Sequence, residues 1–186
     1  RFSDYAQEIH SQIINRVNPI IVNYRMNAGY LPKDHWTQGA EGGGRIIGEG
    51  CHILDLFTYF TGSKAETVSI NSISPNTESV SGSDNCFITV KYEDGSVCNL
   101  LYTGQGNKDY GKEYCEVFCD GKVYTIDDYK VLKSYGGMAK RIQSASSEKG
   151  QYQELVAFYE AIKNGDGYPI PVWQLEQTSK ISFIKN

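Results

Sequence analysis

Hydrophobic residues recur at helical spacing in four stretches of the chain. Apolar positions three and four residues apart predict helices over residues 3–16, 45–60, 151–163 and 172–184. Pro19 ends the first pattern, and Thr61-Gly62 stops the second. The first apolar stripe consists of Phe2, Ala6, Ile9, Ile13 and Val17, and that of residues 151–163 consists of Leu155, Phe158, Tyr159 and Ile162.

The middle of the chain alternates apolar and polar residues, which indicates β-strands. The expected strands are residues 20–26, 68–73, 86–92, 97–102, 114–119, 123–126 and 131–135. Asp94-Gly95 and Asp120-Gly121 are strong hairpin signals, and consecutive hairpins imply antiparallel pairing. We therefore predict an α+β fold, with one large, mostly antiparallel, open-faced sheet and helices packed on one face. The other face would carry Phe, Tyr and Leu side chains, so we expect a homo-oligomer formed through it.

Composition and charge narrow the class of protein. The 186 residues suit a single domain over 1–186, and the net charge of −4 argues against nucleic acid or an anionic membrane as the main partner. No apolar run approaches the roughly 20 residues needed to span a bilayer. Five cysteines without CxxC spacing indicate reduced, mostly buried thiols in a cytoplasmic protein. The abrupt start at Arg1, without a methionine, suggests a piece of a longer protein.

A long loop, residues 27–44, separates the first strand from the second helix and ends in the triplet Gly42-Gly43-Gly44. A loop of this length in a compact domain is usually functional or disordered, and its aromatic and charged content favours a functional role. Asn27, His35 and Trp36 are its candidate ligand-binding residues. Trp36 has an alternative interpretation as a plug that holds the loop to the sheet.

The helix after this loop carries the most informative polar residues. At 100° per residue, Arg45, Glu49 and His52 would fall within about 60° of helix surface, with Asp55 further round. A histidine beside a carboxylate can move protons near neutral pH, so His52 and Glu49 are the catalytic candidates. The alternative is a simple surface contact between residues three apart.

Other kinds of site fail on their motifs. A single Glu-x-x-His outside a four-helix bundle argues against a di-iron centre, and the absence of His-Glu-x-x-His excludes a zincin, so we expect no metal. The glycine triplet lacks the Gly-Lys-Ser/Thr ending of a nucleotide-hydrolase loop. Gly104-Gln105-Gly106 precedes a strand rather than a helix. We conclude that no nucleotide-binding βαβ unit is present.

These residues resemble the C-terminal domain of the glucose-fructose oxidoreductase / inositol dehydrogenase / MocA-type oxidoreductases. That family carries glycines followed by Asp-x-Gly-x-His-x-x-Asp, which Gly50, His52 and Asp55 match. The closing segment that begins at Glu154-Leu155 and ends at Pro169 also looks like the family's. Residues 27–36 and 44–49 look more specifically like a bacterial subgroup linked to surface-polysaccharide synthesis. The resemblance covers nearly the whole chain.

The resemblance implies a substrate-side domain whose nucleotide-binding domain is missing upstream. The full protein would oxidise or reduce a sugar or sugar-nucleotide carbon with NAD or NADP, and the isolated chain would be inactive. His52 would transfer the proton. Gly48 stands where the family has an assisting Asp, which makes Glu49 the substitute carboxylate. We expect Arg45, Asn27, His35, Trp36 and Asp55 to bind substrate.

Two other functions stay open. The same domain could be a non-catalytic oligomerisation or sugar-sensing module, because a fold alone does not establish activity. It could also be a carbohydrate-binding domain that acts in cis.

Overall fold

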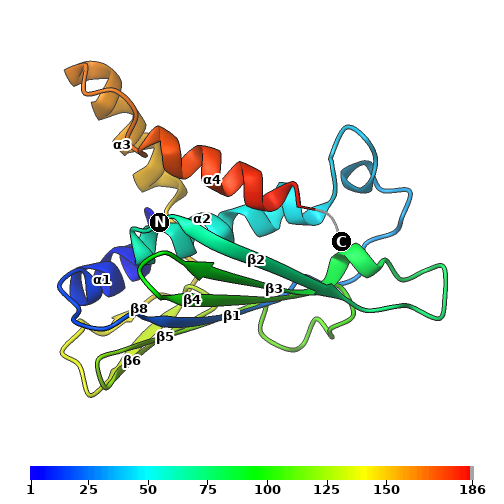
Figure 1. The fold of residues 1–186 in the computed structure, drawn as a ribbon, viewed down its shortest axis with the longest axis horizontal. Helices are drawn as coiled ribbons and strands as arrows, with labels where there is room; N and C mark the ends of the chain where they lie inside the picture. The colour runs from blue at the N-terminus through cyan, green and yellow to red at the C-terminus, as the bar shows by residue number, and fades with distance from the viewer. Residues whose placement is uncertain (185–186) are drawn as a thin grey trace.

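A computed structural model describes residues 1–184, which form one eight-stranded sheet with helices on one of its faces (Figure 1). The helices are α1 (Asp4–Ile13), α2 (Cys51–Thr61), α3 (Gln151–Asn164) and α4 (Val172–Ser182). The strands are β1 (Ile21–Asn27), β2 (Ala65–Ser72), β3 (Asn85–Tyr92), β4 (Val97–Thr103), β5 (Glu113–Cys119), β6 (Lys122–Asp127), β7 (Val131–Tyr135) and β8 (Ile142–Gln143).

The sheet has the order β2-β3-β4-β1-β5-β6-β7-β8. Every neighbouring pair is antiparallel except β1 and β4, which run parallel with Ile21 opposite Val97. Hairpins at the two Asp-Gly turns join β3 to β4 and β5 to β6, where Gly95 and Gly121 adopt positive φ. The prediction of a large, mostly antiparallel sheet is confirmed, and β8 is a short strand that the alternation did not reveal.

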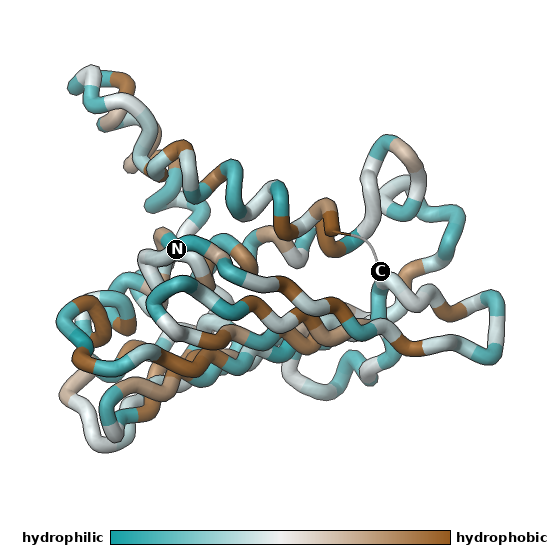
Figure 2. The backbone as a smooth tube through the Cα atoms, viewed as in Figure 1, coloured by the Kyte–Doolittle hydropathy of each residue, from teal (hydrophilic) through white to brown (hydrophobic). Residues whose placement is uncertain are grey.

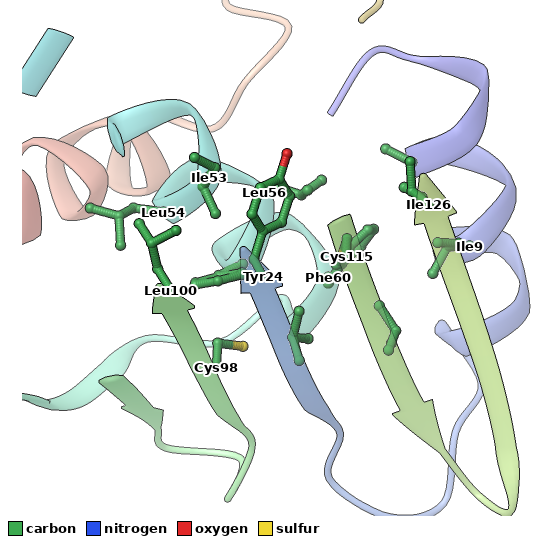
Figure 3. Close-up of a cluster of buried hydrophobic side chains, with 14 of the residues drawn as sticks. Ile9, Tyr24, Ile53, Leu54, Leu56, Phe60, Cys98, Leu100, Cys115 and Ile126 are labelled. Carbon is green, nitrogen blue, oxygen red and sulfur yellow. The ribbon is translucent and has the colours of Figure 1, made fainter. Parts of the chain in front are cut away.

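The core lies between the sheet and the helices. Alternate residues of β1, β3, β4 and β5 are buried against α1 and α2, as the strand pleat requires (Figure 3). α4 packs on α2. The largest fully buried side chains are Tyr5, Tyr24, Tyr92, Tyr102, Tyr124, Phe57, Phe60, Ile9, Ile13, Ile20, Leu54 and Leu56. These residues fix α2, and therefore any group on its polar side, against the sheet.

No described residue of the chain covers the opposite face of the sheet. Exposed aromatic and aliphatic side chains such as Phe87, Phe118 and Ile21 lie on it. A row of hydrogen bonds crosses its centre over four adjacent strands and joins Thr89, Asn99, Asn23 and Glu116. The face is therefore less apolar than the sequence suggested.

Three helical predictions need correction. Val17, expected on the buried stripe of the first helix, is 89% exposed because α1 ends at Ile13. α3 has the predicted apolar stripe, but its four residues are exposed among residues 1–184, namely Leu155, Phe158, Tyr159 and Ile162. The buried residue of that helix is Ala161. Figures 1 and 2 show that α3 projects away from the sheet, which leaves its apolar positions largely exposed. Residues 172–184 were expected to form one helix, which ends at Ser182.

Candidate active site

A cavity of about 370 Å³ lies where the start of α2 meets β1 and the segment before α3. Its lining includes charged and aromatic groups from segments far apart in the sequence. They are Arg1, Phe2, Tyr24, Glu49, His52, Asp55, Glu113, Tyr129, Lys149 and Glu154. Three of the residues predicted from the sequence, His52, Glu49 and Asp55, are thus brought together.

The helix that carries these residues does not begin as predicted. Residues Ile46–Gly50 form a π-helical turn, in which the Cys51 N–H donates to the Ile46 carbonyl five residues earlier. A regular α-helix over residues 45–60 is therefore wrong for its first turn, and so is the placing of Arg45, Glu49 and His52 on one stripe at 100° per residue. Arg45 turns into the protein, whereas Gly48 and Glu49 face the cavity. Such π turns are frequent at functional sites.

Glu49 is held by three side chains. Its carboxylate accepts hydrogen bonds from Lys112 Nζ at 2.7 Å, from Tyr102 Oη at 2.5 Å and from Arg45 Nη2 at 3.3 Å. Burial raises the pKa of the Glu49 carboxyl, but these partners outweigh it, and the net pKa lies below its ordinary value. Burial and the bond to Glu49 raise the pKa of Tyr102. Glu49 is accordingly a fixed anion at neutral pH.

His52 differs from Glu49 and Asp55 because its ring is uncommitted, which means that it makes no hydrogen bond to a described residue. The side chain is exposed on the first turn of α2 and lines the cavity. Among residues 1–184 its ring nitrogens have no hydrogen-bond partner, so both are available to a ligand. A neutral imidazole can accept a proton at one nitrogen while the other donates.

Asp55 lines the same cavity but is paired. Its carboxylate receives Arg1 Nε at 2.8 Å and Arg1 Nη2 at 2.5 Å. The Arg1 side chain is only 6% exposed, and it also donates to Gln174 on α4. This bidentate pair closes one end of the cavity and ties the start of the chain to α2.

Arg45 and Asn27, predicted to bind substrate, make contacts within the protein. Arg45 donates to the carbonyl oxygens of Gly29 and Ala28 at 2.6 Å and 3.0 Å, which anchors the long loop to α2. Asn27 is buried and donates to the Asn107 and Tyr110 carbonyls. Neither residue lines the cavity that contains His52.

His35 and Trp36 lie in the long loop, outside the lining of this cavity. The His35 ring contacts Thr37 Oγ1 at 2.9 Å and caps the short 3-10 turn Trp36–Gln38. Trp36 is 64% exposed, so it does not plug the loop onto the sheet. The structure thus separates these two residues from His52, and a role in substrate binding stays a prediction.

Sequence reasoning missed the group opposite α2. Glu113 at the start of β5 is buried and accepts hydrogen bonds from the Tyr24 hydroxyl and from Lys149 Nζ. Burial, Tyr129 and Glu113 raise the pKa of Tyr24 well above its ordinary value, so its hydroxyl keeps its proton. The sequence does not mark Glu113 as a site residue because a polar residue at the end of a strand is common. Lys149 is not marked because it lies in a polar stretch.

Other kinds of site find little support in the described residues. Residues 1–184 contain no cluster of three or more His, Cys, Asp or Glu side chains placed to hold a metal ion. Within the same range, no helix is both long and apolar enough to cross a membrane. All five cysteines are unpaired thiols, and Cys86, Cys98, Cys115 and Cys119 are buried. The Gly104-Gln105-Gly106 loop joins β4 to β5, as predicted.

The fold is thus an open-faced α+β domain, and its candidate site is a polar cavity lined by a histidine whose ring nitrogens are free within the described chain. The sequence model of the GFO/IDH/MocA C-terminal domain family matches residues 5–125, so the chain belongs to that family. No curated protein sequence matches the chain.

Solved structures agree with this assignment. UDP-N-acetylglucosamine 3-dehydrogenase GnnA from Acidithiobacillus ferrooxidans is 15% identical (TM-score 0.72; 96% of this chain, 55% of that chain). A myo-inositol dehydrogenase from Corynebacterium glutamicum is 16% identical (TM-score 0.68; 98% and 58%). A dehydrogenase from Chromobacterium violaceum is 13% identical (TM-score 0.70; 97% and 56%). At these identities the likeness shows the fold, and the chain spans little more than half the length of these structures.

Proposed function

We propose that this chain is the substrate-side domain of an NAD(P)-dependent oxidoreductase that acts on a hydroxyl or carbonyl carbon of a sugar or sugar nucleotide. The observation that carries the proposal is the uncommitted His52 ring, held by α2 over a cavity lined with charged side chains. Relatives of this fold are described as dehydrogenases of a polyol and of a nucleotide sugar. Surface-polysaccharide synthesis in the cytoplasm is the setting we propose.

In this proposal His52 exchanges the proton of the substrate hydroxyl. During oxidation the ring accepts that proton, and during reduction it returns it. Glu49, ionised and fixed, supplies negative charge on the His52 side of the cavity rather than carrying the proton itself. Gly48 has open space where a Cβ would lie, so the cavity extends over the position of the family's Asp.

The residues present do not fit a bound dinucleotide. The glycine triplet leads into a π-helical turn, and Gly104-Gln105-Gly106 connects two strands. Neither segment is the strand-loop-helix cradle that binds a pyrophosphate. We therefore assign the cofactor to a separate nucleotide-binding domain. The matched structures are longer than this chain, and the exposed apolar stripe of α3 is available for a contact of this kind.

The test compares the isolated chain with a protein in which it is joined to its nucleotide-binding domain. With NAD or NADP and either myo-inositol or UDP-N-acetylglucosamine, we expect NAD(P)H formation by the joined protein alone. His52→Ala should lower kcat by about 10²–10⁴-fold, because it removes the general acid-base group. His10→Ala is the matched control, since His10 stacks on Tyr59 outside the cavity lining. Turnover by the isolated chain, or an unchanged rate in His52→Ala, would contradict the proposal.

A non-catalytic sugar-sensing or oligomerisation module is the second candidate function. The observation in its favour is that Glu49 and Asp55 are both already paired, so neither of these carboxylates is free to pair with His52. Such a module would bind a sugar equally well before and after His52→Ala, and would show no turnover when joined to a nucleotide-binding domain.

We also propose that the uncovered face of the sheet joins two copies of the chain. Phe87 and Phe118 lie on either side of the central polar row, which offers hydrogen-bond partners to a second copy. Light scattering should detect a dimer that Phe87→Lys/Phe118→Lys converts to monomer. Met138→Lys, at a 93% exposed position outside the strands, should leave the dimer intact. A monomeric wild-type chain would refute this assembly.

A further inference from the structure

The wall of the cavity opposite α2 contains an ion pair that the function described so far does not use. Glu113 is only 7% exposed in its side chain and binds Lys149 Nζ, whose side chain is 36% exposed. Tyr24 donates to the same carboxylate from β1. All three residues line the cavity together with His52.

The Glu113 carboxylate is fixed in place. The backbone N–H of Glu113 donates to Asp128 Oδ1 at 2.5 Å, and the buried Tyr24 hydroxyl donates to Glu113 Oε2. A buried carboxylate needs a cation, so Glu113 keeps the Lys149 ammonium at this point of the wall.

The backbone of Lys149 is fixed as well. The next residue, Gly150, adopts φ +86° and lies directly against the backbone of Phe2 and Ser3. Glu148 N–H, on the other side, donates to the Tyr129 carbonyl at 3.0 Å. The lysine side chain therefore starts from an immobilised segment and ends on an immobilised anion.

Donor capacity remains at the ammonium. A lysine has three N–H donors, and within residues 1–184 Lys149 uses its ammonium on Glu113 alone. The partly exposed ammonium thus presents unused donors to the cavity. A polyol substrate is rich in oxygen acceptors, whereas the four ionised carboxylates of the lining, Glu49, Asp55, Glu113 and Glu154, can only accept.

We propose that Lys149 contacts an oxygen of the substrate, and that Glu113 and Tyr24 are positioning residues that aim it. The proposal rests on the proposed oxidoreductase function and adds a donor from this domain to the cavity that His52 also lines. Lys149 binds the substrate before and during the reaction without transferring a proton. The substrate class this favours is a neutral polyhydroxylated ring, because Arg1 and Lys149, the arginine and the lysine of the lining, each already pair with a carboxylate.

The test uses the protein joined to its nucleotide-binding domain, with myo-inositol and UDP-N-acetylglucosamine as probes. Lys149→Met should lower kcat/KM by roughly 10- to 150-fold, the value of one charge-assisted hydrogen bond, and the loss should appear mainly in KM. Lys149→Arg should recover part of it. Lys91→Met is the matched control, because Lys91 pairs with Glu66 through an exposed ion pair at 2.8 Å away from the cavity.

A double variant separates binding from stability. Lys149→Met alone leaves Glu113 buried without a cation, and a folding defect could follow. Glu113→Gln/Lys149→Met removes both charges and keeps an acceptor for Tyr24. A substrate contact predicts that the double variant folds and keeps the high KM. Recovery of the wild-type KM in the double variant overturns the proposal and makes the pair structural.

Binding to the isolated chain provides a readout that does not require turnover. We expect myo-inositol to shift the Gly150 amide resonance in nuclear magnetic resonance spectra, and the double variant to weaken that binding by a similar factor. Equal binding by wild type and double variant overturns the Lys149 contact while leaving the role of His52 intact. Loss of turnover in His52→Ala with unchanged KM in Lys149→Met has the same meaning. If His52→Ala is fully active, the proposed function fails independently.

Discussion

Gly150 is the position where a single methyl group should disturb both stability and the site. It adopts φ +86°, and a Cβ built there would lie 2.3 Å from Ser3 N, 2.5 Å from Phe2 C and 2.7 Å from Ser3 Cα. All three atoms belong to backbone, so no side chain can rotate away. Gly150→Ala must therefore displace residues 2–3, which follow the Arg1 that pairs with Asp55.

The expected loss of stability in Gly150→Ala has a backbone contribution and a steric contribution. A left-handed alanine costs about 1–2 kcal/mol, offset by roughly 0.4–1 kcal/mol from the stiffer unfolded chain. The steric conflict adds about 1–3 kcal/mol, as overpacking does elsewhere. We expect Gly150→Ala to lower the free energy of unfolding by about 2–4 kcal/mol, or the melting temperature by roughly 5–15 °C for a chain of this size.

Gly165→Ala is the control. Gly165 also has positive φ, +71°, but no atom lies within 4 Å of its ideal Cβ. It should show the backbone contribution alone, about 1 kcal/mol. Urea unfolding of both variants, followed by circular dichroism, measures the difference. Equal destabilisation by the two substitutions would refute the view that the start of the chain is packed against Gly150.

Two further predictions concern titration. Because the pKa of Glu49 is lowered in the folded state, its contribution to stability is present above its ordinary value of 4.5 and is lost as pH falls through the lowered pKa. Glu49→Gln should therefore cost about 1–2 kcal/mol at neutral pH and progressively less in acid, with partial exposure limiting the effect; a pH-independent difference in urea unfolding would contradict this. Burial raises the pKa of all five thiols, that of Cys86 to about 11, but Cys51 is the one that is not fully buried, so a thiol reagent near pH 8 should reach and modify Cys51 first, as mass spectrometry can check. Rapid labelling of all five cysteines in the folded chain would contradict that order.

The sheet was predictable because strand alternation and hairpin turns are local signals. The pattern of residues 86–102, with Asp94-Gly95 between its two halves, defines β3 and β4 almost to the residue. The parallel pairing of β1 with β4 was not predictable, because β1 shows the same alternation whichever strand lies beside it. Only the tertiary structure decides that pairing.

The part of the candidate site on α2 has a signal in the sequence, whereas the part on other elements has none. His52 and Glu49 stand out because a glycine-rich segment precedes polar residues on an otherwise apolar helix. The π-helical turn that leaves Arg45 outside the cavity lining depends on one shifted hydrogen bond, which has no clear sequence signal. Glu113 and Lys149 meet through folding alone, since they lie on different sides of three strands in the sequence.

The position of β1 has a consequence for how the chain folds. β2, β3 and β4 can pair as neighbours in sequence, as can β5, β6, β7 and β8, and both groups consist of local hairpins. β1 must close long loops to reach β4 and β5, which is slow because chain entropy is lost before contacts form. Tyr24 and Met26 lie on β1 and line the cavity. We therefore expect the cavity to be completed only when β1 joins the two groups of hairpins, as a late step of folding.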